Sequence, residues 1–422
     1  MESNIKALPP HHPAGDIVTG VDGARRSLLG GLVAAGTVAT LPMAAQAQPK
    51  EINVGVILPL SGANAQFGIN SRNGIELVAD EINAAGGIKS LSGARIKLIV
   101  ADGTSTSTTA ASVAQRLISQ NEVVAILGAF ASSLTIAISE VTERRGIPLL
   151  TMSFADQITG RGFKNVFQVV SKASVIGRAQ FDYAVAIAQA AGEEVKRAAI
   201  MFEDTAYGTS QATGLRAAAK DANIELVMDD AYPLGITDVT PLITKLRASG
   251  AQMVFPVSYL NDSLLIIRTM AQQQVELPAI GGAAGYVIPD FVKGLGGLSE
   301  GVLSVSPANY DSTPALTERF RKRFGYFMVH EALEHATCLG VLAEALEQAG
   351  KVDTAAIREA LQKGTFTQGW SAAMSPAGVK FDATGLNTMA SPVMVQWQKG
   401  ELATVWPKKL AKAPARWKGK SV

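Results

Sequence analysis

Short apolar runs alternate with amphipathic stretches along most of the chain, from residue 52 to about residue 305. The apolar runs are rich in Val and Ile and are typical of buried strands. Between them, apolar residues recur at the spacing of one helix face, for example in 110–118. Because strands alternate with helices, the pattern predicts an α/β fold with parallel sheets and right-handed crossovers. The expected strands are 52–60, 96–101, 123–127, 147–151, 198–202, 224–228 and 253–257.

The alternation occurs in two sets, which predicts two structural units rather than one. The segment 171–173 between the sets is expected to be a crossing strand. Helical patterns dominate 312–363, and 379–406 is expected to form strands and turns. The tail 408–420 is basic, contains prolines and has no apolar period, so we expect it to be solvated.

Composition supports this organisation and excludes one class of partner. At 422 residues the chain is longer than one ordinary domain and suits two. Its 47% hydrophobic residues are enough to bury a large core, and its 40 glycines suit many tight turns. The net charge is only +2 and shows no basic stripe, so we expect no nucleic-acid partner.

Residues 1–47 have the organisation of an export signal. Arg25 and Arg26 precede a mild apolar run that ends in Ala45-Gln46-Ala47, with small residues at the two positions that signal peptidase reads. The arginine pair resembles a twin-arginine signal, although its neighbours match that pattern only in part. A membrane anchor is the alternative, because the run approaches spanning length, but its glycines and Pro42 weaken that interpretation. We therefore expect removal of the signal and localisation in the periplasm.

The sequence does not match the motifs that are typical of catalysis, metal binding or cofactor binding. The sequence H-E-A-L-E-H runs from His330 to His335, and its histidines are five apart, whereas a zinc-binding helix needs them four apart. Cys338 is the single cysteine, so it forms no internal disulfide, and we expect a buried structural thiol. The phosphate-binding glycine motifs and the nucleophile elbow are missing. The sequence therefore predicts a protein that is not an enzyme, with no catalytic residue, no metal and no cofactor.

The stretch 52–87 reads INVGVILPLSGANAQFGINSRNGIELVADEINAAGG, an apolar strand, a loop of small residues and a helix. It closely resembles the start of the mature branched-chain amino-acid binding proteins of bacterial ABC importers, the Leu/Ile/Val-binding family. The resemblance continues to Val405-Trp406-Pro407. It implies a two-lobed type I periplasmic binding protein fold, in which each lobe has a mainly parallel sheet flanked by helices and three strands form a hinge. The implied lobes are 48–172 plus 307–383, and 173–306 plus 384–422.

Two serine-containing turns are the candidate anion site. Ser132 and Ser133 stand between a strand end and a helix start, where unpaired N–H groups and hydroxyls favour an anion. Simple N-capping by serine is the alternative. The resemblance implies that Ser132 contacts a ligand carboxylate, together with Ser153 in the turn that also contains Phe154.

Aromatic residues are the candidate contacts to the rest of the ligand. The resemblance implies that Phe67 covers the ligand side chain, and that Tyr207 and Tyr259 contact the ligand from the second lobe. Packing at the edge of the cleft is the alternative for each tyrosine.

One departure from the family affects the choice of ligand. Members that bind α-amino acids place an acid in lobe two, where our alignment puts Gly282, Ala283 and Ala284. A buried ammonium without a partner would cost several kcal/mol. Either Asp262 or Asp204 replaces that acid, or the ligand has no amine, and we favour the second explanation.

The resulting hypothesis is a periplasmic solute-binding protein that works as a monomer. It captures a small organic carboxylate, or a branched-chain or hydrophobic amino-acid-like compound, and delivers it to an ABC permease. The alternative is a periplasmic ligand sensor for a signalling receptor, which the fold alone does not distinguish from a transport component.

We expect the exported protein to begin near residue 48, which N-terminal sequencing of the periplasmic fraction checks. Changing both Arg25 and Arg26 to Lys should block export, because the twin-arginine pathway reads the guanidinium pair. Normal export of this double variant would favour the general secretory route instead.

Overall fold

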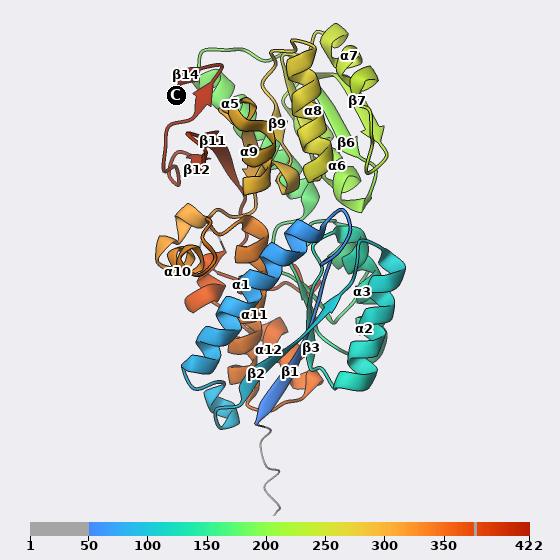
Figure 1. Ribbon diagram of the computed structural model, residues 1–422, viewed down its shortest axis with the longest axis vertical. Helices are drawn as coiled ribbons and strands as arrows, with labels where there is room; N and C mark the ends of the chain where they lie inside the picture. The colour runs from blue at the N-terminus through green and yellow to red at the C-terminus, as the bar shows by residue number, and fades with distance from the viewer. Residues whose placement is uncertain (1–49, 375–377) are drawn as a thin grey trace, which may run out of the picture. The chain divides into compact units, whose positions relative to one another are not determined.

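The computed structural model describes residues 50–374 and 378–422, so the signal expected at 1–47 lies outside the described residues. In this part of the chain, strands alternate with helices as the pattern predicts, and the α/β fold class is confirmed (Figure 1). Among the described helices, none combines the length and the apolarity that a membrane crossing requires.

The first sheet group consists of five parallel strands in the order β2-β1-β3-β4-β5. Val54 on β1 is in register with Leu98 on one side and with Ala125 on the other. Helices α1 and α11 lie on one side of β1–β3, and α2 and α3 lie on the other (Figure 1). Because helices cover both faces of this sheet, its strands are almost continuously apolar. The strands are β1 (Glu51–Leu58), β2 (Arg95–Asp102), β3 (Ala125–Gly128), β4 (Leu149–Thr151) and β5 (Val166–Gln168); the helices are α1 (Ala65–Ala84), α2 (Ser107–Asn121), α3 (Ser132–Arg145), α4 (Gln157–Gly160) and α11 (His330–Ala349).

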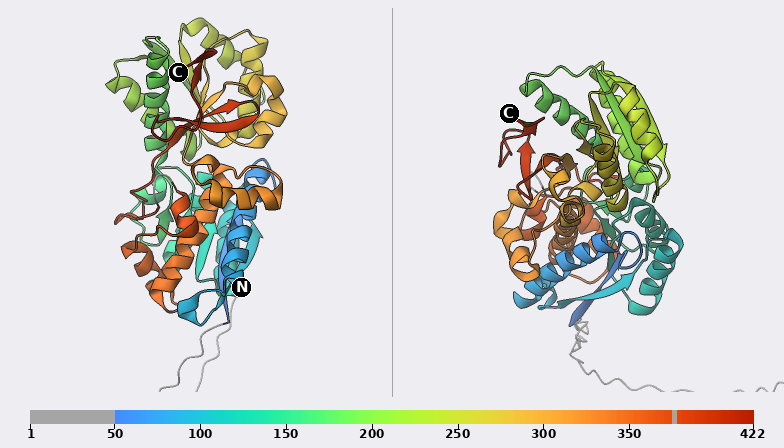
Figure 2. Two further views of the ribbon diagram at one scale, coloured as in Figure 1. Left: turned by 90° about the vertical axis from the view of Figure 1, so that its left-hand side faces the viewer. Right: turned by 45° about the horizontal axis from the view of Figure 1, so that its top comes forward.

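The second sheet group joins two small sheets. The parallel sheet β7-β6-β8 is linked by a bridge between Val254 and Ala279 to the sheet β12-β11-β10-β9, in which only β9 and β10 are parallel. Helix α5 packs against α6 and against β11 (Figure 2). The strands are β6 (Arg197–Glu203), β7 (Glu225–Tyr232), β8 (Met253–Val257), β9 (Ile280–Gly281), β10 (Leu303–Ser306), β11 (Val393–Gln398) and β12 (Glu401–Trp406); the helices are α5 (Ala173–Ala190), α6 (Ala206–Asp221), α7 (Thr240–Ser249), α8 (Leu260–Gln272) and α9 (Pro289–Leu295).

The chain passes three times between the two sheet groups. It crosses between β5 and α5, returns between β10 and the helices α10 (Pro314–Phe324), α11 and α12 (Thr354–Lys363), and crosses again ahead of β11. Helix α11 packs against α1, β3 and β4, so these late helices complete the first sheet group. Leu386 forms a bridge with Gln168 at the edge of that group just before the last crossing.

All seven strands expected from the apolar pattern are present. The strands β5, β9 and β10 were not predicted, because runs of two to four residues carry too little periodic signal. The crossing strand expected at 171–173 is wrong. Lys172 is extended but Ala173 already begins α5, and Ser171 donates a side-chain hydrogen bond to the Ala390 carbonyl instead of entering a ladder.

The expectation of a solvated C-terminal tail is also wrong. The tail forms a small hairpin of β13 (Arg416–Trp417) and β14 (Lys420–Ser421). Trp417 is buried, and its indole N–H donates to Glu193 at 2.9 Å, while Lys418 pairs with the same carboxylate. One buried indole and one ion pair therefore hold the tail against the protein. These contacts need no apolar periodicity in the tail, so the sequence pattern did not predict them.

Helices α1 and α11 approach each other closely at Gly74. A Cβ atom at this position would lie 2.2 Å from the Ala332 carbonyl oxygen, which is backbone and unable to give way locally. The absence of a side chain at Gly74 therefore sets the spacing between α1 and the start of α11.

We expect Gly74→Ala to destabilise the protein by about 1–3 kcal/mol, because overpacking would outweigh the gain in helix propensity. Urea denaturation checks this. Gly160→Ala is the matched control, since a Cβ at Gly160 would meet nothing within 4 Å. Equal midpoints for the two variants would contradict the close approach of the helices.

Candidate functional site

Both sheet groups change strand order at a point where ligands commonly bind. In the first group β1 has β2 on one side and β3 on the other, and in the second group β6 lies between β7 and β8. At such switch points the loops after neighbouring parallel strands run to opposite faces of the sheet and leave a crevice at the carboxyl ends. The loops after β3, β4, β6, β8 and β9, with the helix starts that follow them, supply the side chains that line the cavity described next.

A small cavity of about 10 Å³ lies where these loops meet. The structure places Ser132, Phe154, Tyr207 and Tyr259 in its lining, four of the residues predicted from the sequence. It adds Phe130, which the sequence did not single out, and Ala284, which the sequence placed only where amino-acid binders carry an acid. All six lining residues are buried, and none carries a charge.

Aromatic rings from the two sheet groups face each other around this cavity. Phe154 lies 5.7 Å from Tyr207, and Phe130 lies 5.9 Å from Tyr259, measured between ring centroids. The two tyrosine rings are 5.4 Å apart. Phe67 does not line the cavity; it stacks on Phe130 at 4.1 Å and supports that ring from behind. Such edge and offset contacts are the favoured geometries of aromatic pairs.

Ser132 combines a hydroxyl with a helix start. Its Oγ accepts a hydrogen bond from the Ala155 amide at 3.1 Å, which leaves the hydroxyl proton available to donate. The N-capping alternative is wrong, because Ala131 is the N-cap and Ser132 is the first residue of α3. The first-turn amides of Ser132 and Ser133 have no intrahelical acceptor. The side chain of Ser133 is only half-buried and does not line the cavity.

Ser153 holds the loop that carries Phe130. Its Oγ donates to the carbonyls of Ala129 and Phe130 at 2.7 and 2.9 Å, and it lies 2.6 Å from the Thr135 hydroxyl. Ser153 is not among the residues that line the cavity. Its hydroxyl therefore positions the lining, and direct contact with a ligand stays a prediction.

The loop from Gly282 to Ala284 supports the opposite wall. The Tyr207 hydroxyl donates to the Gly282 carbonyl, and burial raises the pKa of Tyr207 well above its usual value, which keeps the phenol neutral. Ala283 and Ala284 have φ angles of 72° and 40°, a region that L-residues seldom adopt. The amide of Ala283 is bonded to the Ser304 hydroxyl at 3.1 Å, whereas Ala284 faces the cavity.

No carboxylate lines the described cavity. Asp204 is exposed and accepts from the Leu234 amide, and Asp262 is buried beside the Gly235 amide, 3.5 Å from its oxygen. Glu203 caps the start of α6 through the backbone N–H groups of Thr205 and Gly208. Neither acid suggested from the sequence therefore stands where a ligand ammonium would need it.

A group of buried polar residues was missed because its motif was considered only for zinc. The described part of the chain contains no cluster of side chains arranged to hold a metal. His330 nevertheless lies behind the cavity wall, with its ring 6.3 Å from Phe130 and 6.0 Å from Phe154. Two acids and two histidines within the first six residues of α11 were the available signal. Cys338 is buried as expected, and burial raises its pKa.

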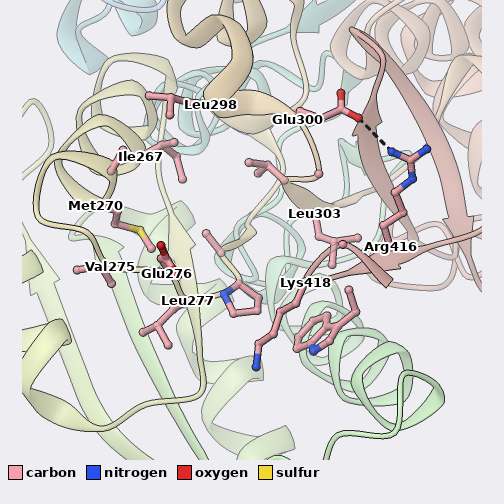
Figure 3. A pocket seen from close by; sticks show the side chains of 17 residues that line it. Ile267, Met270, Val275, Glu276, Leu277, Leu298, Glu300, Leu303, Arg416 and Lys418 are labelled. Carbon is pink, nitrogen blue, oxygen red and sulfur yellow. Dashed lines mark hydrogen bonds and ion pairs between the residues drawn. The ribbon is translucent and has the colours of Figure 1, made fainter. Parts of the chain in front are cut away.

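A larger cavity, of about 410 Å³, lies in the second sheet group (Figure 3). Ile267, Leu298 and Leu303 contribute apolar surface, and Glu300 pairs with Arg416 at its edge. This cavity adjoins the amino ends of β9 and β10, opposite to the ends where ligands bind in such sheets. We therefore take the aromatic cavity as the candidate site.

Comparisons with known proteins agree with this fold. A family model described as periplasmic binding protein matches residues 51–401. The Leu/Ile/Val-binding protein homolog 8 of Brucella abortus (strain 2308) is 33% identical over 382 residues, which cover 87% of this chain and 93% of the relative. The chain therefore belongs to the periplasmic binding protein family.

Two solved structures have the same fold at low identity. The branched-chain amino acid transporter substrate-binding protein LivJ from Streptococcus pneumoniae, in complex with isoleucine, has a TM-score of 0.74 and 22% identity, covering 83% of this chain and 97% of that one. A solute-binding protein of an ABC transporter from R. palustris, in complex with benzoate, has a TM-score of 0.72 and 20% identity, covering 84% and 95%.

Asp262 should make the stability of the folded protein depend on pH. Burial raises its pKa from 3.8 to about 6, so the folded state holds this proton more tightly than the unfolded state. The resulting stabilisation is present at acidic pH and is lost as pH rises through about 6. We expect Asp262→Asn to remove this loss and to raise the melting temperature at neutral pH.

Melting curves across this pH range check the expectation, with Asp204→Asn as the control at an exposed position. If wild type and Asp262→Asn lost stability in parallel as pH rose, Asp262 would not be the group responsible.

Proposed function

We propose that the chain is a periplasmic solute-binding protein that captures a small carboxylate without an α-ammonium group and delivers it to an ABC importer. The observation that carries this proposal is the composition of the cavity lining. It offers four aromatic rings and one serine at a helix start, and it offers no carboxylate. In this proposal the protein works as a monomer in the periplasm, after removal of residues 1–47, and performs no catalytic step.

The start of α3 is the proposed binding point for the carboxylate. Ser132 can donate through its hydroxyl, and the first-turn amides and the helix dipole favour a negative group. The aromatic rings would cover the apolar body of the ligand. An α-ammonium would be buried among these rings without a counter-charge, at a cost of several kcal/mol.

The ligands of the two structural neighbours represent the two alternative ligand classes. LivJ was solved with isoleucine and the R. palustris protein with benzoate, and both ligands carry a carboxylate. Only isoleucine carries an α-ammonium. The lining found here favours a ligand of the benzoate type, because rings stack well on rings and because the lining offers no acid to pair with an amine.

Ligand entry would require the two sheet groups to separate. The cavity has a volume of about 10 Å³, far below the roughly 300–1000 Å³ of typical ligand sites, and its walls come from both groups. We propose that the three crossing segments act as a hinge between lobes 48–172 plus 307–383 and 173–306 plus 384–422. In this proposal Phe67, Ser153 and Ala283 support the lining, and Phe154, Tyr207 and Tyr259 contact the ligand. Ser133 contributes its backbone amide at the start of α3 and not its side chain.

A thermal-shift panel tests the ligand class. We expect benzoate and related simple acids to raise the melting temperature more than leucine, isoleucine or valine does. At a hundredfold excess over Kd, binding stabilises by about 2.7 kcal/mol, so a true ligand is visible. Micromolar binding of leucine, abolished by Asp262→Ala or Asp204→Ala, would overturn the proposed class.

Ser132→Ala should weaken binding of the best acid in the panel by about tenfold or more. A hydrogen bond to a charged group contributes about 1.5–3 kcal/mol, and about 1.4 kcal/mol corresponds to tenfold in Kd. Calorimetry measures the change, and Ser133→Ala is the matched control because its side chain does not line the cavity. Unchanged affinity in Ser132→Ala would remove this residue from the site.

A further inference from the structure

The first turns of α11 bury three titratable side chains directly behind the aromatic cavity. His330, Glu331 and Glu334 are 3%, 0% and 0% exposed. The His330 ring is near Phe130 and Phe154, which both line the cavity. The His330 ring is therefore separated from the cavity by one layer of aromatic rings.

The hydrogen bonds of this cluster are incomplete. His330 Nδ1 faces the Glu334 carboxyl at 3.2 Å, and Glu331 Oε1 accepts from the Asn70 side chain at 2.8 Å. The remaining atoms, His330 Nε2 and Glu331 Oε2, have no hydrogen-bond partner among the described residues and lie 3.4 Å from each other. Buried polar atoms normally have a hydrogen-bond partner. His330 Nε2 and Glu331 Oε2 face each other beside a cavity without one, and this arrangement requires an explanation.

The surroundings supply no fixed positive charge. On α11 the titratable neighbours of His330 are Glu331, Glu334, His335 and Cys338. The groups that approach the cluster from other elements are neutral: the Asn70 side chain on α1 donates to Glu331, and the Tyr326 hydroxyl ahead of α11 donates to Asn70. Tyr207 and Tyr259 line the cavity itself. Among the described residues, no Lys or Arg pairs with the cluster. An anionic ligand would therefore meet two buried acids and no cation.

Protonation of the pair is the available way to remove its negative charge when an anion enters the cavity. Burial lowers the pKa of His330 and raises the pKa of Glu331 to about 7, so near neutral pH the pair is not fully protonated. Burial also raises the pKa of Glu334, which keeps that carboxyl protonated as the partner of Nδ1. A negative charge entering nearby favours the addition of one proton to the His330–Glu331 pair.

We propose that His330 and Glu331 form a proton-accepting pair that selects anionic ligands: when a carboxylate enters the aromatic cavity, the pair takes up one proton from water and balances the ligand's charge. This inference rests on the proposed function, because it presupposes an anionic ligand. It assigns to His330 and Glu331 a positioning and selecting role behind the cavity wall. The proton is the only species transferred, and no covalent bond between heavy atoms changes.

Calorimetry of the full chain with benzoate tests the proposal. Titrations in two buffers with different ionisation enthalpies should reveal uptake of close to one proton. The affinity for benzoate should fall by up to about tenfold for each unit of pH above about 7, as the linkage of one proton requires. Benzamide, an uncharged probe of similar shape, should bind without proton uptake.

Glu331→Gln and His330→Gln should each remove the proton uptake and flatten the pH profile for benzoate. His335→Gln is the matched control, since His335 is a buried histidine on the same helix that bonds the Glu331 carbonyl and makes no ring contact with Phe130 or Phe154. The imidazole resonances of His330 and His335, assigned with these variants, give a second readout, because the chain has only four histidines. Benzoate should shift the titration of His330 to higher pH.

The outcomes separate this inference from the proposed function. Benzoate binding by the wild type with no proton uptake and no pH dependence would overturn the inference and leave the carboxylate-binding function standing. Proton uptake that persisted in Glu331→Gln and His330→Gln would overturn the assignment to these residues. If the wild type bound no carboxylate at all, the proposed function would fail, and the inference with it.

Discussion

Parallel pairing of the strands is the constraint on which the rest of this structure depends. Parallel strands need long crossovers, so the helices cover both faces of the first sheet and the loops after the strands gather at one edge. Where β1 lies between β2 and β3, and β6 between β7 and β8, those loops diverge and leave room. Phe130 and Ser132 follow β3, and Tyr207 follows β6. Their meeting around one cavity follows from strand order more than from any local propensity.

The polar groups near this cavity divide into two kinds. Ser153, Glu203 and the Tyr207 hydroxyl are buried and bonded to backbone, and they fix the loops that carry the lining. His330 and Glu331 are equally buried but keep unpartnered atoms. Satisfied groups confer rigidity, whereas incompletely satisfied groups in a low-dielectric interior respond strongly to an added charge. This contrast is the reason that the proposed proton uptake is assigned to these two residues and not to the nearby acids.

The sequence predicted the site in part, and the missing residues have a common cause. Ser132, Phe154, Tyr207 and Tyr259 were recognised from motifs at strand ends, and the structure brings them together. Phe130 and Ala284 stand in the same loops but carry no distinguishing pattern. His330 was missed because a motif is judged by spacing along the chain, whereas its position behind Phe130 and Phe154 depends on how α11 packs on α1.

The sequence by itself determined the α/β class, the seven main strands and the serine-bearing helix start at Ser132, because hydrophobic period and turn chemistry are local properties. Only the tertiary structure decided that the C-terminal tail docks through Trp417, that Ser153 supports the loop of Phe130, and that no acid faces the cavity. These outcomes depend on contacts between residues far apart in the chain. Neither the depth of burial of a side chain nor the partner of each polar atom is encoded in any short stretch of sequence.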